Sequence, residues 1–174
     1  MTDKTLAQLR GKHSRAAGAQ FENMIDGACV WYGHNGLAKI RKAEEPMKPI
    51  RSLGAGRFLA CFTKKSEIDY KGVLNGGQMI AFEAKHTDTG IVQQNRLEEW
   101  QMADLREFER MGAIAFVLLS YGMERFYRIP FKMWDDMKNQ FGRVSLREAD
   151  IPEYRISVKS GRLQILEGLV DGEA

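Results

Sequence analysis

The residues best suited to chemistry are an aspartate, Asp69, and the run Phe82-Glu83-Ala84-Lys85 that begins thirteen positions later. Alternate residues of a β-strand share a face, so Glu83 and Lys85 are expected to project together, about 7 Å apart along the chain. Carboxylate oxygens are the hard ligands that Mg²⁺ or Mn²⁺ prefers, and a nearby ammonium can orient or deprotonate an attacking water. The spacing therefore indicates a candidate site for metal-assisted hydrolysis.

The turn between these two elements decides whether the carboxylates meet. Asn75-Gly76-Gly77 is a strong hairpin signal. A three-residue loop would pair Leu74 with Gln78 and place Asp69 opposite Glu83 on one face, with Cβ atoms about 5 Å apart. Carboxylates that close repel each other unless a proton or a cation lies between them. A two-residue loop would put them on opposite faces and remove the site.

Hydrophobic periodicity predicts the elements that would carry this hairpin. After a loose basic lead-in over residues 1–13, we expect an amphipathic helix from Ser14, its N-cap, to about Tyr32, ended by Gly33 or Asn35-Gly36. The remaining predicted elements are strands Leu37–Arg41 and Phe58–Phe62, a hairpin of Ile68–Leu74 and Gln78–Lys85, a helix Arg96–Met111 stopped by Gly112, a buried strand Ala113–Ser120, a strand Arg125–Ile129, a helix Phe131–Gln140, and a terminal hairpin of Tyr154–Val158 and Leu163–Leu166. This order predicts an α/β fold with a mixed central sheet flanked by helices.

Length and composition fit a single domain over residues 1–174, with a tail from about residue 150. The 174 residues are 44% hydrophobic and 28% charged, which is ordinary for a globular protein. No apolar run approaches the roughly 20 residues that span a bilayer, and the polar stretch Met1–Arg15 does not resemble a signal peptide. Cys29 and Cys61 lie far apart without a CxxC partner, which argues against a zinc site or a disulfide framework. We expect a soluble cytoplasmic protein with no membrane partner.

Basic residues are concentrated in the first third of the chain. Residues 1–65 hold 12 Lys and Arg against 5 Asp and Glu, whereas residues 66–174 hold 14 against 18, giving the net charge of +3. A basic N-terminal third suggests a surface for a polyanion. The alternative is a solvated charged face, and charge alone does not separate the two.

Residues 42–57 form an excursion between predicted strands. Its helix and strand breakers are Pro46, Pro49, Gly54 and Gly56, and its basic residues include Lys48, Arg51 and Arg57. A plain surface loop is one interpretation. A structureless connection of this length is uncommon in a small domain, however, which favours a functional projection.

Asp69 followed by Glu83-Ala84-Lys85 resembles the PD-(D/E)xK nuclease signature. The short motif also arises by chance, and a salt bridge at an exposed strand edge is the alternative. Longer stretches resemble one family within that superfamily, the RecU-type Holliday junction resolvases. They are FTKKSEIDYKG at Phe62–Gly72, IAFEAKHT at Ile80–Thr87, Gly18–Glu22 on the first helix, the insertion 42–57, Trp100-Gln101, and the apolar strand near Ala115–Leu119. The likeness covers roughly residues 10–135.

This resemblance implies a restriction-endonuclease-like fold and a catalytic divalent metal ion, Mg²⁺ or Mn²⁺. Asp69 and Glu83 would be its ligands, the Ala84 carbonyl could supply another, and Lys85 would serve the attacking water. Relief of negative charge on the scissile phosphate, which phosphodiester hydrolysis needs, would come from one or two such ions.

Three further residues enter through the resemblance. Gln101 matches a family glutamine close to the active site. Glu22 matches an acid of the first helix that would lie at the edge of the metal site, although it can also be read as a solvated helix residue. Glu67 stands where better-known relatives carry a threonine, and as a third acid on the Asp69 face it could tighten metal binding or alter metal preference.

The resemblance also implies DNA as the partner, in the form of a four-way junction. The insertion matches the family's protruding basic stalk, thought to enter the centre of the junction. The basic residues expected on DNA phosphates are Arg10, Lys12, Arg15, Lys48, Arg51, Arg57, Lys64 and Lys65. A junction has pseudo-twofold symmetry and requires two matched cuts, so a C2 homodimer is expected.

The main hypothesis is thus a metal-dependent, structure-selective DNA endonuclease that resolves four-way junctions. Another PD-(D/E)xK nuclease, of a repair or restriction type, is the alternative enzyme. A non-catalytic protein that binds DNA junctions is the alternative from another class, although such a clamp would not need the intact set of Asp69, Glu83 and Lys85.

Overall fold

The computed structural model describes residues 3–44, 46–62 and 67–170. The helices are α1 (Asp3–His34), α2 (Glu99–Arg110), α3 (Phe131–Asp135) and α4 (Met137–Phe141), and a 3₁₀ turn, η1, covers Gln94–Arg96. The strands are β1 (Ala38–Lys42), β2 (Met47–Gly54), β3 (Arg57–Phe62), β4 (Tyr70–Leu74), β5 (Met79–Thr87), β6 (Ile91–Gln93), β7 (Ile114–Tyr121), β8 (Arg125–Pro130), β9 (Ser145–Arg147), β10 (Arg155–Ile156), β11 (Val158–Lys159) and β12 (Arg162–Leu163).

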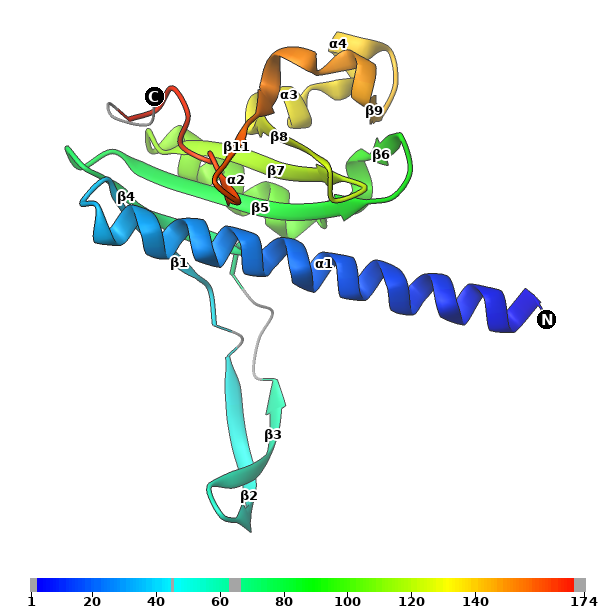
Figure 1. Ribbon diagram of the computed structural model, residues 1–174, viewed down its shortest axis with the longest axis vertical. Coiled ribbons are helices and arrows are strands. Elements are labelled where there is room, and N and C mark those ends of the chain that lie inside the picture. Colours follow the sequence, from blue (N-terminus) through cyan, green and yellow to red (C-terminus); the bar gives the residue numbers. More distant parts are fainter. Residues whose placement is uncertain (1–2, 45, 63–66, 171–174) are drawn as a thin grey trace.

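A mixed sheet of six strands forms the centre of the molecule, in the order β1-β4-β5-β7-β8-β10. Strands β5 and β7 pair in parallel, and the other neighbouring strands pair antiparallel. Helix α1 lies along one face, as Figure 1 shows, and α2, α3 and α4 pack on the other. The predicted mixed sheet with flanking helices is therefore confirmed.

Helix α1 is longer than predicted at its N-terminal end. The expected apolar stripe, Ala17, Phe21, Ile25, Ala28 and Tyr32, is buried against the sheet, and the helix ends at His34, before Asn35-Gly36. The helix begins at Asp3, however, so the expected loose lead-in and the N-cap at Ser14 are wrong. The described side chains between residues 11 and 16 are exposed, and this part of the helix extends beyond the sheet (Figure 1). The residues of this part form helix without packing against the core. Apolar periodicity marks only the part of a helix that packs on a core, so it could not predict the extension.

The hairpin of β4 and β5 has the register on which the candidate site depends. The paired residues run from Val73 with Met79 to Tyr70 with Phe82, and the N–H of Leu74 donates to the Gln78 carbonyl at 2.8 Å. The loop is therefore the three-residue one. On the α1 face, the rings of Tyr70 and Phe82 stack with centroids 4.9 Å apart, and Phe82 stacks on Phe116 of β7 at 4.6 Å. This stack fixes the strands that carry the site.

The basic excursion is a two-stranded antiparallel ribbon, which we call the stalk, comprising β2 and β3. It projects away from the sheet (Figure 1), and every residue of both strands is exposed. The expected projection is thus present, but its boundary of 42–57 and its irregular structure are wrong, since β3, the predicted strand Phe58–Phe62, is its second arm. Pro49 is tolerated because an isolated ribbon consists of edge strands and the register shifts beside it. The turn takes up positive φ at Gly54, Ala55 and Gly56.

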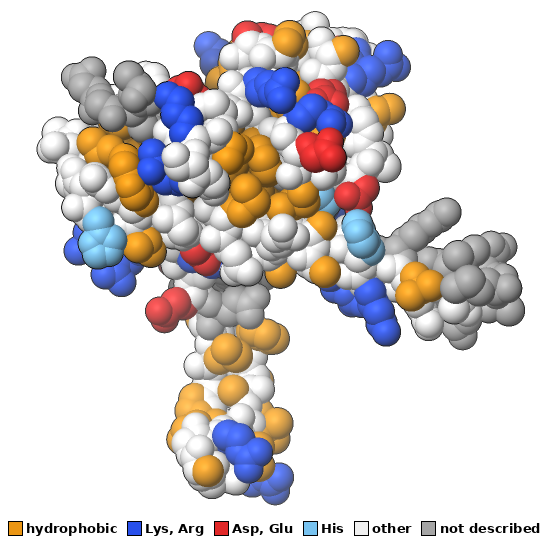
Figure 2. Space-filling view, viewed as in Figure 1, with side chains coloured by type: hydrophobic (Ala, Val, Ile, Leu, Met, Phe, Trp, Pro, Cys, Tyr) orange, Lys and Arg blue, Asp and Glu red, His pale blue; other side chains and the backbone are white. Residues whose placement is uncertain are grey.

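Large apolar side chains lie beside the basic ones on the stalk. Figure 2 shows apolar side chains along the length of the stalk and basic side chains near its free end. The exposed apolar residues there are Met47, Ile50, Leu53, Phe58, Leu59 and Phe62. A ribbon that buries none of them in this chain must be held mainly by its own ladder of hydrogen bonds.

Other predicted elements are shifted. Strand β1 begins and ends one residue later than expected. Helix α2 begins at Glu99 instead of Arg96, since η1 and the extended Leu97 precede it and the N–H of Glu98 donates to Gln101 Oε1 at 3.0 Å. The strand ended by Pro130 and the buried strand near Ala113–Ser120 are confirmed within one residue.

The C-terminal third of the chain differs more from the predicted elements. The helix expected over Phe131–Gln140 is divided at Asp136, whose backbone carbonyl accepts the N–H groups of Asn139 and Gln140, both at 3.1 Å, and so begins α4. The terminal hairpin is present as β11 and β12, but its expected first strand is divided, because Arg155–Ile156 joins the central sheet as β10. None of the described helices combines the length and apolar character required to cross a membrane.

Candidate active site

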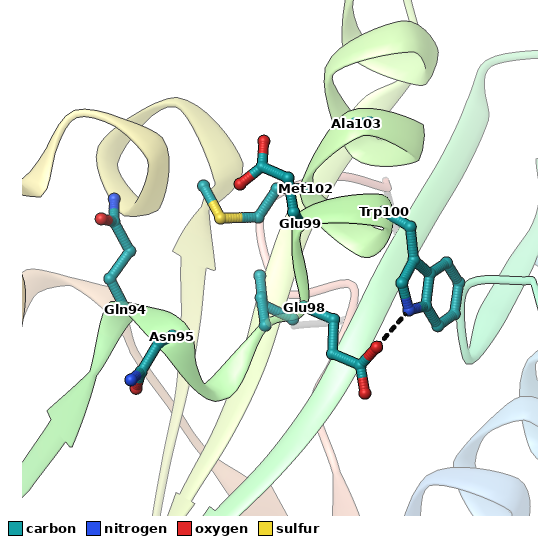
Figure 3. Close-up of a pocket in the computed structure, with 8 residues that line it drawn as sticks. Gln94, Asn95, Glu98, Glu99, Trp100, Met102 and Ala103 are labelled. Carbon is teal, nitrogen blue, oxygen red and sulfur yellow. Dashed lines mark hydrogen bonds between the residues drawn. The ribbon is translucent and has the colours of Figure 1, made fainter.

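Two elements of the sheet and one helix bring the predicted catalytic side chains together. Glu83 and Lys85 lie on the β5 face that packs toward α2, and Asp69 directly precedes β4 at the position opposite Glu83. Helix α2 contributes Gln101 from its first turn. Beside this turn lies an open hollow of about 860 Å³ (Figure 3), where Trp100 Nε1 donates to Glu98 Oε2 at 2.6 Å. None of Asp69, Glu83 and Lys85 lines the hollow, so the candidate active site lies next to it.

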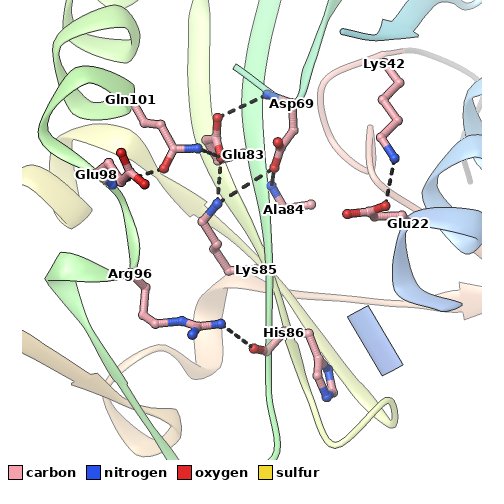
Figure 4. Close-up of polar contacts among 10 residues, drawn as sticks. All are labelled: Glu22, Lys42, Asp69, Glu83, Ala84, Lys85, His86, Arg96, Glu98 and Gln101. Carbon is pink, nitrogen blue, oxygen red and sulfur yellow. Dashed lines mark hydrogen bonds and ion pairs between the residues drawn. The ribbon is translucent and has the colours of Figure 1, made fainter. Parts of the chain in front are cut away.

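Asp69 and Glu83 hold each other through reciprocal hydrogen bonds. The N–H of Asp69 donates to Glu83 Oε1 at 3.1 Å, and the N–H of Ala84 donates to Asp69 Oδ2 at 3.0 Å. Each carboxylate is therefore fixed by the backbone of the other strand (Figure 4). Because both interactions need the two residues to face each other, they confirm the same-face placement that the loop length predicted.

Two further donors converge on the second oxygen of Glu83. Lys85 Nζ lies 2.7 Å from Glu83 Oε2, and Gln101 Nε2 donates to the same oxygen at 2.6 Å. Lys85 Nζ is also 3.9 Å from Asp69 Oδ2, so one ammonium lies against both carboxylates. The predicted set of Asp69, Glu83, Lys85 and Gln101 thus forms one connected cluster.

Burial of Glu83 makes the charged form of its carboxyl group costly in free energy. Glu83 has 0% exposure, and its pKa is raised to about 8, with burial as the largest cause. Within this value, the ammonium of Lys85 lowers the pKa, whereas the charge of Asp69 raises it together with burial. A buried carboxyl group whose charged form is this costly gains free energy from any added positive charge.

The donor set fits a hard divalent cation. Asp69 Oδ1 has no hydrogen-bond partner among the described residues, and the side chain is 31% exposed. Backbone N–H and C=O of one strand residue point to the same edge. Since the Ala84 N–H reaches Asp69, the Ala84 carbonyl also faces the Asp69 side of β5. Two carboxylates and one carbonyl are oxygen ligands that Mg²⁺ and Mn²⁺ accept.

The two other acids implied by the family resemblance do not join the cluster. Glu22 of α1 is paired with Lys42 Nζ at 2.7 Å (Figure 4), and α1 packs on the sheet face opposite Glu83. Glu67 forms an ion pair with Lys71. The described residues contain no group of three or more His, Cys, Asp or Glu side chains placed to hold one metal ion. A third carboxylate ligand from Glu67 is therefore not supported by this arrangement.

The predicted DNA contacts fall on three parts of the chain. Lys48, Arg51 and Arg57 are exposed on the stalk. Lys12 and Arg15 are exposed on the part of α1 that extends beyond the sheet. The side chain of Arg10 and both Lys64 and Lys65 lie outside the described residues.

Two residues near the cluster were missed by sequence reasoning. Lys42 was counted only as part of a basic insertion, and no sequence signal pairs it with Glu22 twenty positions earlier. Arg96 was placed at the start of a helix, whereas it lies in η1 and one guanidinium N–H, at Nη2, donates to the His86 carbonyl at 3.2 Å. Its proximity to β5 depends on the path of the chain between β6 and α2, which periodicity does not determine.

A family model and two curated relatives identify the same family. The family model described as RecU, Recombination protein U, matches residues 16–170. A Holliday junction resolvase RecU from Bacillus pumilus (strain SAFR-032) is 31% identical over 161 residues, which cover 86% of this chain and 77% of the relative. A protein of the same name from Lactococcus lactis subsp. lactis (strain IL1403) is 32% identical over 139 residues, covering 75% of this chain and 64% of the relative. Among solved structures, Hjc of Archaeoglobus fulgidus, a Holliday junction resolvase, is similar with a TM-score of 0.46 and 21% identity, covering 78% of this chain and 93% of that one.

Proposed function

Because the chain belongs to the RecU family, we propose that it is an endonuclease that resolves four-way DNA junctions by paired, symmetric phosphodiester cleavage. The observation that carries this proposal is the connected cluster of Asp69, Glu83, Lys85 and Gln101. A protein that only bound DNA would gain nothing from burying Glu83 against a second carboxylate, since burial of charge costs free energy.

We propose that Asp69, Glu83 and the Ala84 carbonyl hold the metal ion, Mg²⁺ or Mn²⁺. Bound there, such an ion supplies a water of lowered pKa and a positive charge next to the scissile phosphate. The partly exposed side chain of Asp69 and the raised pKa of Glu83 both support this assignment.

The chain's own residues position the reacting groups. Lys85 is held by both carboxylates, so its ammonium would lie beside the metal ligands, where it could orient an attacking water. Gln101 fixes the orientation of Glu83 through a hydrogen bond of 2.6 Å, and the Ala84 N–H does the same for Asp69. Groups fixed before the substrate arrives need no reorganisation during the reaction.

The stalk is proposed to supply the preference for junctions. It carries Lys48, Arg51 and Arg57 for phosphates on a narrow ribbon that extends away from the sheet (Figure 1). Two matched cuts related by twofold symmetry need two active sites in a fixed relation, so we propose that the functional unit is a C2 homodimer.

A synthetic four-way junction incubated with Mg²⁺ tests the proposal. We expect paired nicks at symmetric positions, and no cleavage when EDTA replaces Mg²⁺. Cleavage of linear duplex at a rate equal to that of the junction would indicate a repair or restriction type of nuclease instead. Binding without cleavage would indicate a non-catalytic junction-binding protein and would overturn the assignment of the cluster.

A further inference from the structure

Strand β5 has an open edge directly beside the candidate active site. The ladder between β4 and β5 ends at the pair Tyr70 and Phe82, whereas β5 continues to Thr87. Beyond Phe82, no described strand pairs with β5 on that side. The backbone groups of Ala84 and His86 that face this side are therefore available to side chains.

Two side chains use this open edge. Asp69 accepts from the Ala84 N–H, and Arg96 donates to the His86 carbonyl at 3.2 Å. Residues two apart in a strand direct their backbone polar groups to the same edge, so the Arg96 guanidinium lies on the Asp69 side of β5, about 7 Å beyond Ala84 along the strand. Figure 4 shows Arg96 reaching the strand next to Lys85.

The charge of Arg96 is uncompensated within the described chain. Its side chain is exposed, makes one hydrogen bond, to a neutral carbonyl, and has no carboxylate partner among the described residues. Several other arginines are paired with carboxylates, such as Arg106 with Asp135, Arg125 with Glu148 and Arg143 with Asp150. A guanidinium has five N–H donors in a planar fork. One donor fixes its orientation here, and four remain for an external acceptor.

We propose that Arg96 binds a phosphate of the cleaved strand within one or two nucleotides of the scissile phosphate. The inference rests on the proposed function, because it needs a DNA strand in the candidate active site. Phosphates follow one another at about 3.4 Å of axial rise on one strand, so a separation of about 7 Å from Ala84 corresponds to a near neighbour. A guanidinium already oriented by His86 matches phosphate geometry with two parallel donors and loses little entropy on binding.

A purely structural role for Arg96 makes a different prediction. If its task were only to cap the open edge of β5, removing the guanidinium would lower the melting temperature and affect all DNA ligands equally. A phosphate contact acts instead on one position of one strand, with little effect on folding. The two roles are therefore separable by experiment.

The test replaces single phosphates of a synthetic junction by uncharged methylphosphonates, position by position around the cleavage site. Binding is measured in EDTA for the wild-type protein, Arg96→Gln, Arg96→Lys and the control Arg155→Gln, which removes an exposed arginine from β10 at the opposite edge of the sheet. We expect the wild type and Arg155→Gln to lose about tenfold in affinity at one position near the cut. Arg96→Gln should bind the unmodified junction about tenfold more weakly and be insensitive to that same replacement, with Arg96→Lys intermediate.

The inference is overturned if Arg96→Gln keeps the wild-type sensitivity at every position, or if its only defect is a lowered melting temperature. This outcome is distinct from failure of the proposed function, in which the wild type with Mg²⁺ does not cut the junction at all. Because binding is measured without metal, the phosphate contact is tested independently of catalysis.

Discussion

The backbone N–H of Ala43 donates a hydrogen bond to the carbonyl of Asp69 at 2.8 Å. Ala43 follows β1 and leads into the stalk, so the segment by which the chain enters the stalk is hydrogen-bonded to a carboxylate residue of the candidate active site. Lys42, the last residue of β1, is linked to Asp69 through its charge. The hydrogen bond from Lys42 to Glu22 is the main cause that raises the pKa of Lys42, and the negative charge of Asp69 also raises it. A displacement of the chain where it enters the stalk would therefore reach Asp69 through a single backbone hydrogen bond.

The stalk should be removable without loss of the fold. Replacing Pro49–Ala60 by an Asn-Gly turn joins Lys48 to Cys61, which face each other in the ribbon. The removed residues are exposed, so we expect the melting temperature to change by less than about 5 °C. The affinity ratio between a four-way junction and linear duplex should fall toward one, as measured by competition binding. A large drop in melting temperature would show that the stalk supports the core.

Asp69→Asn should separate cleavage from binding. The substitution removes the charge of a proposed metal ligand, so we expect cleavage of a synthetic junction to fall at least about a hundredfold. Binding in EDTA should be retained, because the residues proposed to contact phosphates lie elsewhere. Glu109→Gln, an exposed charge removal on α2, is the matched control and should cleave normally. A variant of Asp69 that neither folds nor binds would assign this residue a structural role.

The C-terminal part should carry a pH-dependent contribution to stability through Glu148. Burial alone would raise the pKa of this carboxyl group, but hydrogen bonds from Arg125 and Tyr127 outweigh burial and lower it. A lowered folded-state pKa stabilises the fold above the ordinary carboxyl pKa, and this contribution disappears as the pH falls through the folded-state value.

Glu148→Gln should therefore lower the free energy of unfolding by about 0.5–1 kcal/mol at pH 7 and by much less near pH 3. Urea denaturation at both pH values measures the difference. The neighbouring and more exposed Glu124 provides the control Glu124→Gln, which should have a smaller effect at pH 7. An equal loss for Glu148→Gln at both pH values would contradict the role of its charge.

Gly72 should be required for the pairing of β1 with β4. A Cβ atom added there would lie 2.3 Å from the Lys39 carbonyl oxygen and 2.6 Å from the Ile40 Cα, both backbone atoms that cannot move aside without separating the strands. We expect Gly72→Ala to cost about 3 kcal/mol or more of unfolding free energy. Gly27→Ala on α1 meets no atom within 4 Å and should instead stabilise the protein by about 0.5–1 kcal/mol. Equal melting temperatures for the two variants would contradict this packing.

Local sequence patterns were sufficient for the hairpin that carries the site. Asn75-Gly76-Gly77 specifies a short turn, and the alternation of residues in β5 then determines which side chains share a face. Both signals act between neighbours, which is why the opposition of Asp69 and Glu83 could be predicted from a count of residues. The strands of the stalk were harder to predict from the sequence, because Pro49 and the glycines break regular structure in a sheet interior but are tolerated in an isolated two-stranded ribbon.

By itself, the sequence determined the order of the main elements, the two registers open to the central hairpin and the residues of the carboxylate pair, since these depend on turn chemistry and on period-two alternation. Only the tertiary structure decided which side chains far apart in the sequence meet around the site: Gln101 on Glu83, Lys42 on Glu22 and Arg96 on His86. It also decided that Glu67 pairs with Lys71. The physical reason is that such contacts depend on how helices and loops cross the sheet, and many crossings satisfy the same hydrophobic pattern. The energy that selects one crossing comes from packing of the whole core.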